Sequence, residues 1–421
     1  MSRFRFVHAA DLHLDTPFDG LSRLGASVPT VLRDASLQAF DNLIDLTLES
    51  GADLLILAGD IYDGPSRGLR AQLRVREGLK RLSDAGVQVA LVHGNHDPVE
   101  EGWSAIGDWP DGVTAFPTGE VGSVALTRDG RDLARVYGIS YAKRATKENL
   151  ARRFPGETDA PFAIGVLHAN VGNNAEHAAY SPCTLDDLRA ADMDYWALGH
   201  IHRYQQLSEH APTVIYPGVI QGRSPKPSEQ GAKGAVVVDV AEGRVAGVTF
   251  RDLDVVRFES FDLDIADIPD TGALQDRLQQ LADAAVDAAA GRQLVLRARL
   301  TGRGPVHAAL RAGDGTGDLV SVLQDASDRV WWDKIVDDTA PPLDLDAIRR
   351  RGDFSSELLQ RVDTLLSDPD AFETFFETHA RASGDRRIKP FVESASHDDE
   401  HAALETAARE ALARLEPEDE G

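Results

Sequence analysis

Apolar residues follow two alternating patterns through the first two hundred positions of the chain. Five short apolar runs end at a small or polar residue, as buried strands do: residues 4–9, 52–58, 87–93, 161–168 and 193–199. Residues 32–50 and 67–85, which separate the first three runs, carry apolar side chains at helical spacing. The alternation predicts an α/β fold in which helices cover a largely parallel or mixed β-sheet.

The next apolar runs lie close together with no helical pattern between them. They occupy residues 213–218, 234–240 and 247–253. We expect all three to be antiparallel strands added at the edge of the sheet, because antiparallel neighbours need only short connections.

The pattern changes again near residue 256. A strand pattern (258–265), an Ala-rich helix (271–290), an alternating strand (293–302), a short helix (305–312) and the apolar patch 329–336 predict a small α+β module. Pro341 and Pro342 mark a second boundary, amphipathic helices are expected at 353–367 and 370–382, and a final acidic helix is expected at 400–415. The predicted domains are 1–255, 256–340 and 341–421.

Composition and charge narrow the functional classes. The formal net charge is −25, which disfavours nucleic-acid binding by the surface as a whole but does not exclude it. Basic residues gather in segments 67–81 and 143–153, where they either follow a phosphate backbone or form solvated faces. The acidic balance suits a high-salt cytoplasm or a GC-rich genome.

The compartment is expected to be the cytoplasm. Cys183 is the one cysteine, which suits a reducing environment, and the first fifteen residues reach acidic positions before any long apolar stretch. The longest apolar runs are too short to span a membrane, so no membrane association is expected.

Polar motifs stand at the end of each predicted strand in the first two hundred residues. They are D-L-H (Asp11, His13), G-D-I-Y-D (Asp60, Asp63), G-N-H-D (Asn95, His96, Asp97), a lone His168 and G-H-I-H (His200, His202). The carboxyl ends of strands in an open α/β sheet share one rim, so these motifs should converge. Each motif alone is a weak signal, but all of them in order make coincidence implausible.

The residue types point to a pair of divalent cations. Carboxylate, carboxamide and imidazole groups suit Mn²⁺, Fe or Zn²⁺, whereas the lack of thiolate ligands argues against a structural zinc site. Gly59 and Gly94 precede ligand positions and should let backbone and side chain approach the ions closely. Two adjacent cations would serve the hydrolysis of a phosphate ester.

The ordered set DLH, GDIYD, GNHD, H and GHIH resembles that of the calcineurin-like metallophosphoesterases. Within that family, FVHAADLHLDTPF and YPGVIQGRS resemble the SbcD/YhaO branch, the nuclease subunits of bacterial DNA-repair exonucleases. The motif resemblance covers residues 1–225, and beyond them only the domain layout is similar. The implied fold is a sandwich of mixed β-sheets flanked by helices, with a small α+β capping domain and a C-terminal helical segment.

The resemblance implies a role for each motif residue. The first metal ion would be held by Asp11, His13, Asp60 and His202, and the second by Asp60 as a bridge with Asn95, His168 and His200. His96 would face the scissile phosphate as general acid or transition-state stabiliser, with Asp97 orienting its ring. Both ions are expected to be manganese, the usual metal of this family.

The implied activity is a two-metal DNA exonuclease or endonuclease that acts in double-strand break repair with an SbcC-like coiled-coil ATPase. Arg203, Arg223 and Lys226 are the expected DNA contacts because they follow the metal motifs. The C-terminal helices would dock the ATPase or pair in a homodimer. A phosphatase or small-molecule phosphodiesterase is the alternative, and a scaffold that has lost catalysis is a third hypothesis.

Several other residues have simpler structural interpretations. His8 and His93 lie inside apolar strands and are expected to be hydrogen-bonded core or supporting histidines, and Cys183 a small buried side chain. Asp63 would either support the site or cap a turn. Trp331 and Trp332 are expected to pack in a core rather than stack on bases.

Overall fold

The computed structural model describes most of the 421-residue chain: residues 3–16, 30–64, 68–101, 104, 106–172, 180–381 and 396–415. Arg67, part of the first basic segment, lies outside these residues. The chain divides into two compact units. The first comprises Met1–Ser260, Leu281–Arg297 and Gln324–Lys334, and the second comprises Phe261–Gln280, Ala298–Leu323 and Ile335–Gly421.

The first unit contains two six-stranded mixed sheets. The first sheet has the order β12-β11-β1-β2-β3-β4, with a parallel centre formed by β1 (Arg3–Ala9), β2 (Leu54–Ala58), β3 (Gln88–Val92) and β4 (Val113–Ala115). Strands β11 (Gly234–Ala241) and β12 (Arg244–Asp252) continue it in antiparallel fashion beyond β1.

The second sheet has the order β5-β6-β7-β8-β10-β9. Its parallel centre is β6 (Arg131–Gly138), β7 (Ala163–His168), β8 (Tyr195–Gly199) and β10 (Thr213–Tyr216). An antiparallel strand closes each edge: β5 (Gly122–Arg128) beside β6 and β9 (Gln205–Ser208) beside β10.

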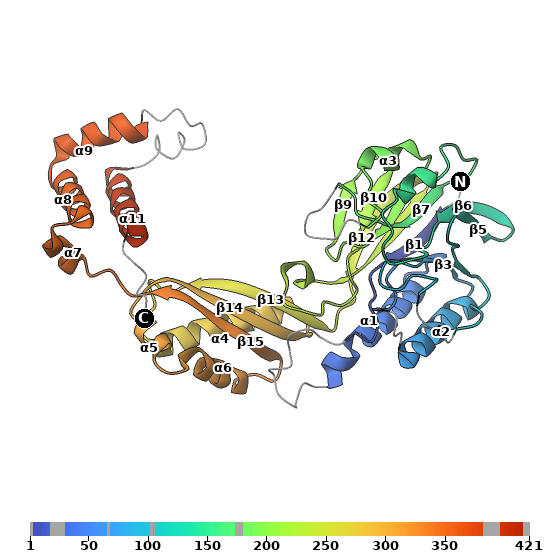
Figure 1. The fold of residues 1–421 in the computed structure, drawn as a ribbon, viewed down its shortest axis with the longest axis horizontal. Helices are drawn as coiled ribbons and strands as arrows, with labels where there is room; N and C mark the ends of the chain where they lie inside the picture. Colours follow the sequence, from blue (N-terminus) through green and yellow to red (C-terminus); the bar gives the residue numbers. More distant parts are fainter. Residues whose placement is uncertain are drawn as a thin grey trace. The chain divides into compact units, whose positions relative to one another are not determined.

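The two sheets pack face to face between helices (Figure 1). Buried side chains of both sheets, such as Phe6 and Ile56 of the first and Ile164 and Ala197 of the second, form the central core. Helices α1 (Thr30–Glu49) and α2 (Leu69–Asp84) cover the outer face of the first sheet, and α3 (Leu185–Ala190) covers that of the second. The predicted sandwich of mixed sheets flanked by helices is confirmed.

One topological prediction was partly wrong. Residues 234–241 and 244–252 do form antiparallel strands, but residues 213–216 form β10, which runs parallel to β8 in the other sheet. The hairpin of β5 and β6 was not predicted. A short apolar run indicates that a strand is buried, but it does not indicate in which of two sheets the strand lies.

A three-stranded sheet follows the sandwich. It has the order β13 (Val256–Asp264), β14 (Gln293–Arg303) and β15 (Val330–Ala340), with α4 (Thr271–Ala288), α5 (His307–Arg311) and α6 (Gly315–Asp325) in the connections. Hydrogen bonds from Gln293 N to Val255 O (3.3 Å) and from Ile265 N to Thr301 O (2.9 Å) show that β13 and β14 run parallel. Trp332 is buried and Trp331 packs on a neighbouring apolar cluster, as expected of core residues.

The C-terminal segment is helical, as predicted. It contains α7 (Leu345–Arg351), α8 (Phe354–Ser367), α9 (Pro369–Phe376), a π-helical turn η4 (Glu377–Arg381) and α11 (His397–Leu415). Aspartate side chains cap the first turns of α7, α8 and α9, and Ile348, Leu359 and Leu412 share a small core. Across the described residues, no helix is long and apolar enough to cross a membrane.

Replacing Ile56 by Ala tests the core between the two sheets. Ile56 is fully buried there, so its truncation should lower the free energy of unfolding by about 2–5 kcal/mol. Urea denaturation followed by circular dichroism measures the change. Leu73→Ala on α2 is the control, since Leu73 is 50% exposed and its loss should cost less than about 1 kcal/mol. Equal losses in the two variants would contradict this account of the core.

Candidate metal centre

The polar motifs meet at one rim of the sandwich. Asp11 and His13 follow β1, Asp60 follows β2, Asn95 and His96 follow β3, His168 ends β7, and His200 and His202 follow β8. The motifs therefore come from the carboxyl ends of parallel strands in both sheets. Packing the two sheets face to face brings the two sets of strand ends together.

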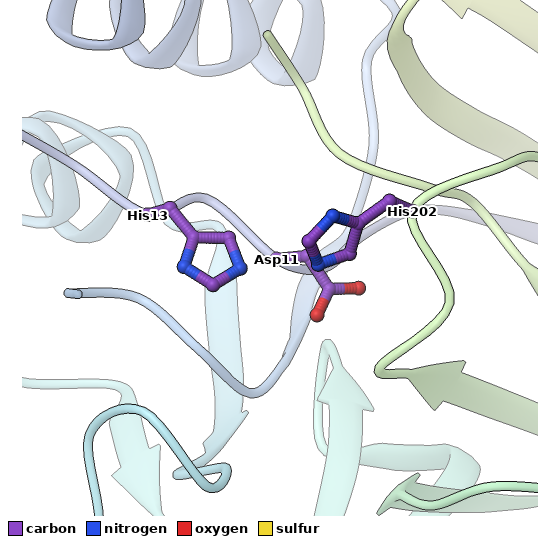
Figure 2. A group of neighbouring side chains, drawn as sticks. All are labelled: Asp11, His13 and His202. Carbon is purple, nitrogen blue, oxygen red and sulfur yellow. The ribbon is translucent and has the colours of Figure 1, made fainter. Parts of the chain in front are cut away.

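Three groups of side chains could each hold a cation, and the third of them consists of His13, Asp63 and His96. In the first, ligand atoms of Asp11, His13 and His202 lie within 4.8 Å of one another, and in the second the same holds for Asp11, Asp60 and His168. Figure 2 shows the first group, with side chains from the segments after β1 and β8 turned toward one another. Asp11 belongs to both the first and the second group, so the two candidate cation positions are adjacent. These clusters are consistent with a dinuclear metal site.

Asp60 lies between the first two groups. Its Oδ2 is 3.3 Å from Nε2 of His168 and 3.8 Å from Nε2 of His13. Separations of this size between donor atoms are those of ligands that share an ion at bond lengths of about 2.0–2.2 Å. The position fits the expected bridging role of Asp60.

The other two predicted ligands adjoin His168. Oδ1 of Asn95 is 3.0 Å from Nε2 of His168, and the ring of His200 lies 5.3 Å from the His168 ring, between centroids. The backbone N–H of His200 donates to both carboxylate oxygens of Asp11 at 3.0 Å. All seven residues predicted to bind metal are thus brought together, and their individual roles as ligands remain predictions.

His13 provides an independent sign of a cation. Both of its ring nitrogens are buried and have no hydrogen-bond partner among the described residues. A buried polar atom without a partner costs about 1–3 kcal/mol, and such atoms are rare in folded proteins. Burial also lowers the pKa of His13 well below its ordinary value, so the imidazole is neutral and its nitrogen is free to bind a metal ion.

Backbone strain is concentrated at the ligands. Asp11, His13, Asp60 and His200 have φ angles of 52°, 42°, 50° and 102°, in the region that side-chain-bearing residues rarely adopt. Hydrogen bonds from Asp11 N to Gly59 O and from His13 N to Asp60 O, both 3.0 Å, hold these turns. Strained backbone of this kind costs about 1–3 kcal/mol per residue and persists where function requires the geometry.

The two glycines singled out in the sequence leave room for the ligands. A Cβ atom on Gly59 would lie 2.4 Å from Nδ1 of His168, and one on Gly94 would lie 2.3 Å from Oδ1 of Asp60. Gly59 also has a φ of +93°, which favours glycine. The prediction that these positions allow close approach is confirmed.

The buried acids and bases of the site form a strongly coupled set. Burial raises the pKa of Asp11 to about 6. Burial opposes the charge of His168, but the carboxylates of Asp60 and Asp11 outweigh it and raise the pKa of His168 to about 9. Burial would also raise the pKa of Asp60, yet His168 and His13 hold it below its usual range. Cation binding at this site must therefore displace the proton of His168.

Asp63, and not Asp97, contacts the ring of His96, which corrects one prediction. Nδ1 of His96 lies 2.5 Å from Oδ1 of Asp63. The buried Asp97 carboxylate instead accepts hydrogen bonds from the backbone N–H of Ile61 (2.9 Å) and Gly94 (2.8 Å), and it lies 3.1 Å from Nδ1 of His93. Asp97 therefore braces the turns that carry Asp60 and Asn95.

Arg223 lies at the candidate centre, as expected from its place after the metal motifs, and its role as a substrate contact stays a prediction. Its guanidinium lies 3.2 Å from Asp63 and 3.6 Å from Glu229, and 14% of its side chain is exposed. Glu229 in turn lies 2.7 Å from Nδ1 of His202. Burial opposes ionisation of Glu229, but His202 and Arg223 lower its pKa to about 2. Nothing in the sequence pattern singled out Glu229, which ends the short 3-10 helix η3 (Pro227–Glu229).

The remaining predicted DNA contacts are at the surface. Arg203 and Lys226 are exposed, and the Arg203 guanidinium donates to Pro227 O at 3.3 Å. The structure thus leaves both cations accessible, and their role as DNA contacts stays a prediction.

The structural interpretations of three other residues are confirmed. His8 is buried, its Nδ1 lies 3.0 Å from the Tyr195 hydroxyl, and burial lowers its pKa to about 3. His93 supports Asp97, as described above. Cys183 is buried, and burial raises the pKa of its thiol to about 12, which leaves it unreactive.

Comparison with known proteins agrees with this geometry. Residues 4–204 match the calcineurin-like phosphoesterase family, and residues 258–340 match the middle domain of metallophosphoesterase YhaO. The uncharacterized metallophosphoesterase YhaO of Bacillus subtilis is 39% identical over 269 residues, which are 64% of this chain and 65% of YhaO. The matched segment thus spans less than two thirds of that relative.

Two more distant relatives have names that refer to nucleic acids. A subunit of the SbcCD nuclease of Bacillus subtilis is 27% identical over 58% of this chain and 68% of its own length. The DNA double-strand break repair protein Mre11 of Halobacterium salinarum is 25% identical over 95% of this chain and 96% of its own length. The resemblance to Mre11 therefore extends beyond the metal motifs.

Replacing Gly94 by Ala tests how tightly the centre is packed. The added methyl group would collide with the Asp60 carboxylate, so Mn²⁺ affinity should fall by about 10- to 100-fold. Isothermal titration with Mn²⁺ measures the change. Gly107→Ala is the matched control, because a Cβ there meets nothing within 4 Å. Unchanged Mn²⁺ affinity in Gly94→Ala would show that the ions bind elsewhere.

Proposed function

Since the chain belongs to the calcineurin-like phosphoesterase family, we propose that it is a DNA nuclease that hydrolyses phosphodiester bonds with two divalent cations, which we expect to be Mn²⁺. It would act as an exonuclease or endonuclease in double-strand break repair. The observation that carries the proposal is the convergence of two cation-binding groups on the shared Asp11, with Asp60 between them.

Each residue of the centre has a part in the proposed reaction. Bound cations would activate the attacking water and offset charge on the phosphate oxygens. Asp11 and Asp60 fix the spacing of the two positions, and the imidazoles of His13 and His168 complete them from opposite sheets. The backbone N–H of His96 donates to Oδ1 of Asp60 at 2.8 Å, which ties the substrate-facing residue to the proposed bridge between the ions.

His96 is suited to protonate the leaving oxygen. Its side chain is 31% exposed, and its ring centroid lies 4.9 Å from that of His13. Because Asp63 engages Nδ1, Nε2 is left to face the substrate. Burial lowers the pKa of His96, but the hydrogen bond to Asp63 and the nearby carboxylates outweigh it and raise the pKa, which favours the protonated form that can donate a proton.

DNA as the substrate is supported by the relatives and opposed by the overall charge. The SbcCD nuclease subunit aligns over 58% of this chain, and Mre11 aligns over 95% of it. The net charge of −25 instead favours the alternative, a phosphatase or small-molecule phosphodiesterase with the same centre. A small anionic substrate needs fewer cationic contacts than a polynucleotide does.

The proposed partner is an SbcC-like coiled-coil ATPase docked on the C-terminal helices. Phe354 of α8 is 69% exposed, although Leu359 of the same helix is buried, so an apolar side chain remains available at the surface. Capture of the ATPase by the full chain, lost in Phe354→Glu, would support this assignment. A homodimer without the ATPase would favour self-association.

Hydrolysis of duplex DNA in the presence of Mn²⁺ tests the proposed function. End-labelled duplex should be degraded by the wild type, and Asp60→Asn should lower the rate at least about a hundredfold because the carboxylate proposed to bridge the two ions is lost. Asp84→Asn, at an exposed residue of α2, is the control and should retain full activity. Brisk turnover of 4-nitrophenyl phosphate with DNA left intact, even with the ATPase present, would favour the alternative.

The pH dependence of cleavage tests the pairing of His96 with Asp63. An acid must be protonated to act, so activity should fall as pH rises through the pKa of His96. Asp63→Asn removes the contact that raises this pKa, and the alkaline limb should therefore move to lower pH. At neutral pH the rate loss should be smaller than the roughly 10²- to 10⁴-fold expected for His96→Ala. An unshifted alkaline limb would rule out the assigned role of Asp63.

A further inference from the structure

The acidic charge requires any nucleic acid to be held by local cations. At −25, the protein as a whole repels a polyanion, so contacts must come from basic residues that no carboxylate neutralises. The two basic segments of the sequence differ in this respect, and the difference identifies one of them as a candidate binding surface.

Most of the basic side chains on α2 form ion pairs with carboxylates, and three of these carboxylates lie on α1. Arg70 pairs with Asp34, Arg74 with Asp41 and Arg81 with Asp45, and Lys80 pairs with Asp84 in its own helix. The three arginine pairs link α2 to α1. Of the α2 cations only the exposed Arg76 has no such ion pair in the described part of the chain, and the paired ones contribute little to binding a phosphate chain.

The second basic segment, residues 143–153, contains some cations that are paired with carboxylates and some that are not. Arg152 pairs with Asp187, and Arg153 pairs with Glu148. Lys143, Arg144 and Lys147 are exposed, and no carboxylate in the described parts of the chain forms an ion pair with them. Three positive charges within five residues are thus available to an anionic ligand.

The turn that carries these cations is tied to the metal centre. Tyr141 donates from its backbone N–H to His93 O at 3.0 Å and from its hydroxyl to His168 O at 2.6 Å. Thr146 closes the turn, with its hydroxyl donating to Lys143 O at 2.8 Å and its carbonyl accepting from Ser181 N at 2.8 Å. The cations consequently have a defined place beside the site and do not lie on a free loop.

The same turn also lies against the segment that follows His96, because the backbone N–H of Val99 donates to Tyr141 O and that of Glu100 donates to Ala142 O, both at 3.0 Å. His96 is the residue expected to face the scissile phosphate. A cation beside it would meet the neighbouring phosphate of the same strand, because the phosphate chain continues past the cleaved bond.

We propose that Lys143, Arg144 and Lys147 bind the backbone phosphates next to the scissile bond, with Arg144 as the main contact. This inference rests on the proposed nuclease function and assigns the surface that confers preference for a polynucleotide. Such contacts are independent of base sequence. Arg203 and Lys226, the exposed cations predicted from the sequence, would extend the same surface.

The test compares a polynucleotide with a small diester. For Arg144→Ala and Arg144→Glu, the KM for a fluorescein-labelled single-stranded oligonucleotide should rise about five- to tenfold or more, with a smaller change in kcat. The slope of log KM against log salt concentration should become shallower by about one for each phosphate that the variant no longer neutralises. Hydrolysis of bis(4-nitrophenyl) phosphate should change much less than cleavage of the oligonucleotide.

Arg152→Ala and Arg74→Ala are the matched controls, because each removes an arginine that is already paired with a carboxylate. Both should behave as the wild type with either substrate. An Arg144→Glu enzyme with unchanged KM and salt slope would overturn the inference while leaving the nuclease function intact. A wild type that hydrolyses the small diester but neither binds nor cleaves the oligonucleotide would overturn both.

Discussion

The contact between Asp60 and His168 joins the two sheets of the sandwich at the place on which the site depends. Asp60 follows β2 of the first sheet, His168 ends β7 of the second, and their side chains lie 3.3 Å apart in a fully buried setting. A lone buried charge would be costly, so the carboxylate and the imidazole must either pair with each other or share a cation. Face-to-face packing of the apolar sheets holds this pair in place, and the glycines at positions 59 and 94 give it room.

Around this pair, a layer of polar residues sets the orientation of each candidate ligand. Asp97 braces the turns that carry Asp60 and Asn95, Asp63 holds the His96 ring, and Glu229 holds His202. Arg223 connects two of these carboxylates, since it lies near both Asp63 and Glu229. The imidazole of a metal ligand is usually fixed in this way through its second nitrogen. The candidate centre is therefore preorganised by its neighbours, and the strained backbone at the ligands is held by the same network.

The distribution of charge explains how an acidic protein could handle an anionic substrate. Several of its arginines, including three on α2 and Arg152, form intramolecular ion pairs, and such exposed pairs add little stability individually. Their effect is to offset positive charge where the pairs lie, as on α2. Uncompensated cations are left near the metal centre, where Arg144 and Arg203 lie on segments that follow strands of the second sheet. Selectivity for an anionic substrate would then come from the position of the unpaired cations and not from the overall charge of the protein.

The sequence by itself determined the class of fold, the identity of the candidate ligands and the rim on which they meet. It could do so because strand and helix periodicities are local, and because parallel strands of a sheet end on one side. It placed β10 in the wrong sheet and assigned the support of His96 to Asp97. Only the tertiary structure revealed Glu229, the pairing of Asp63 with His96, and the ion pairs that link α2 to α1. Those features depend on contacts between residues up to 160 positions apart, as in the pair of Asp63 and Arg223, and such contacts leave no periodic trace in the chain.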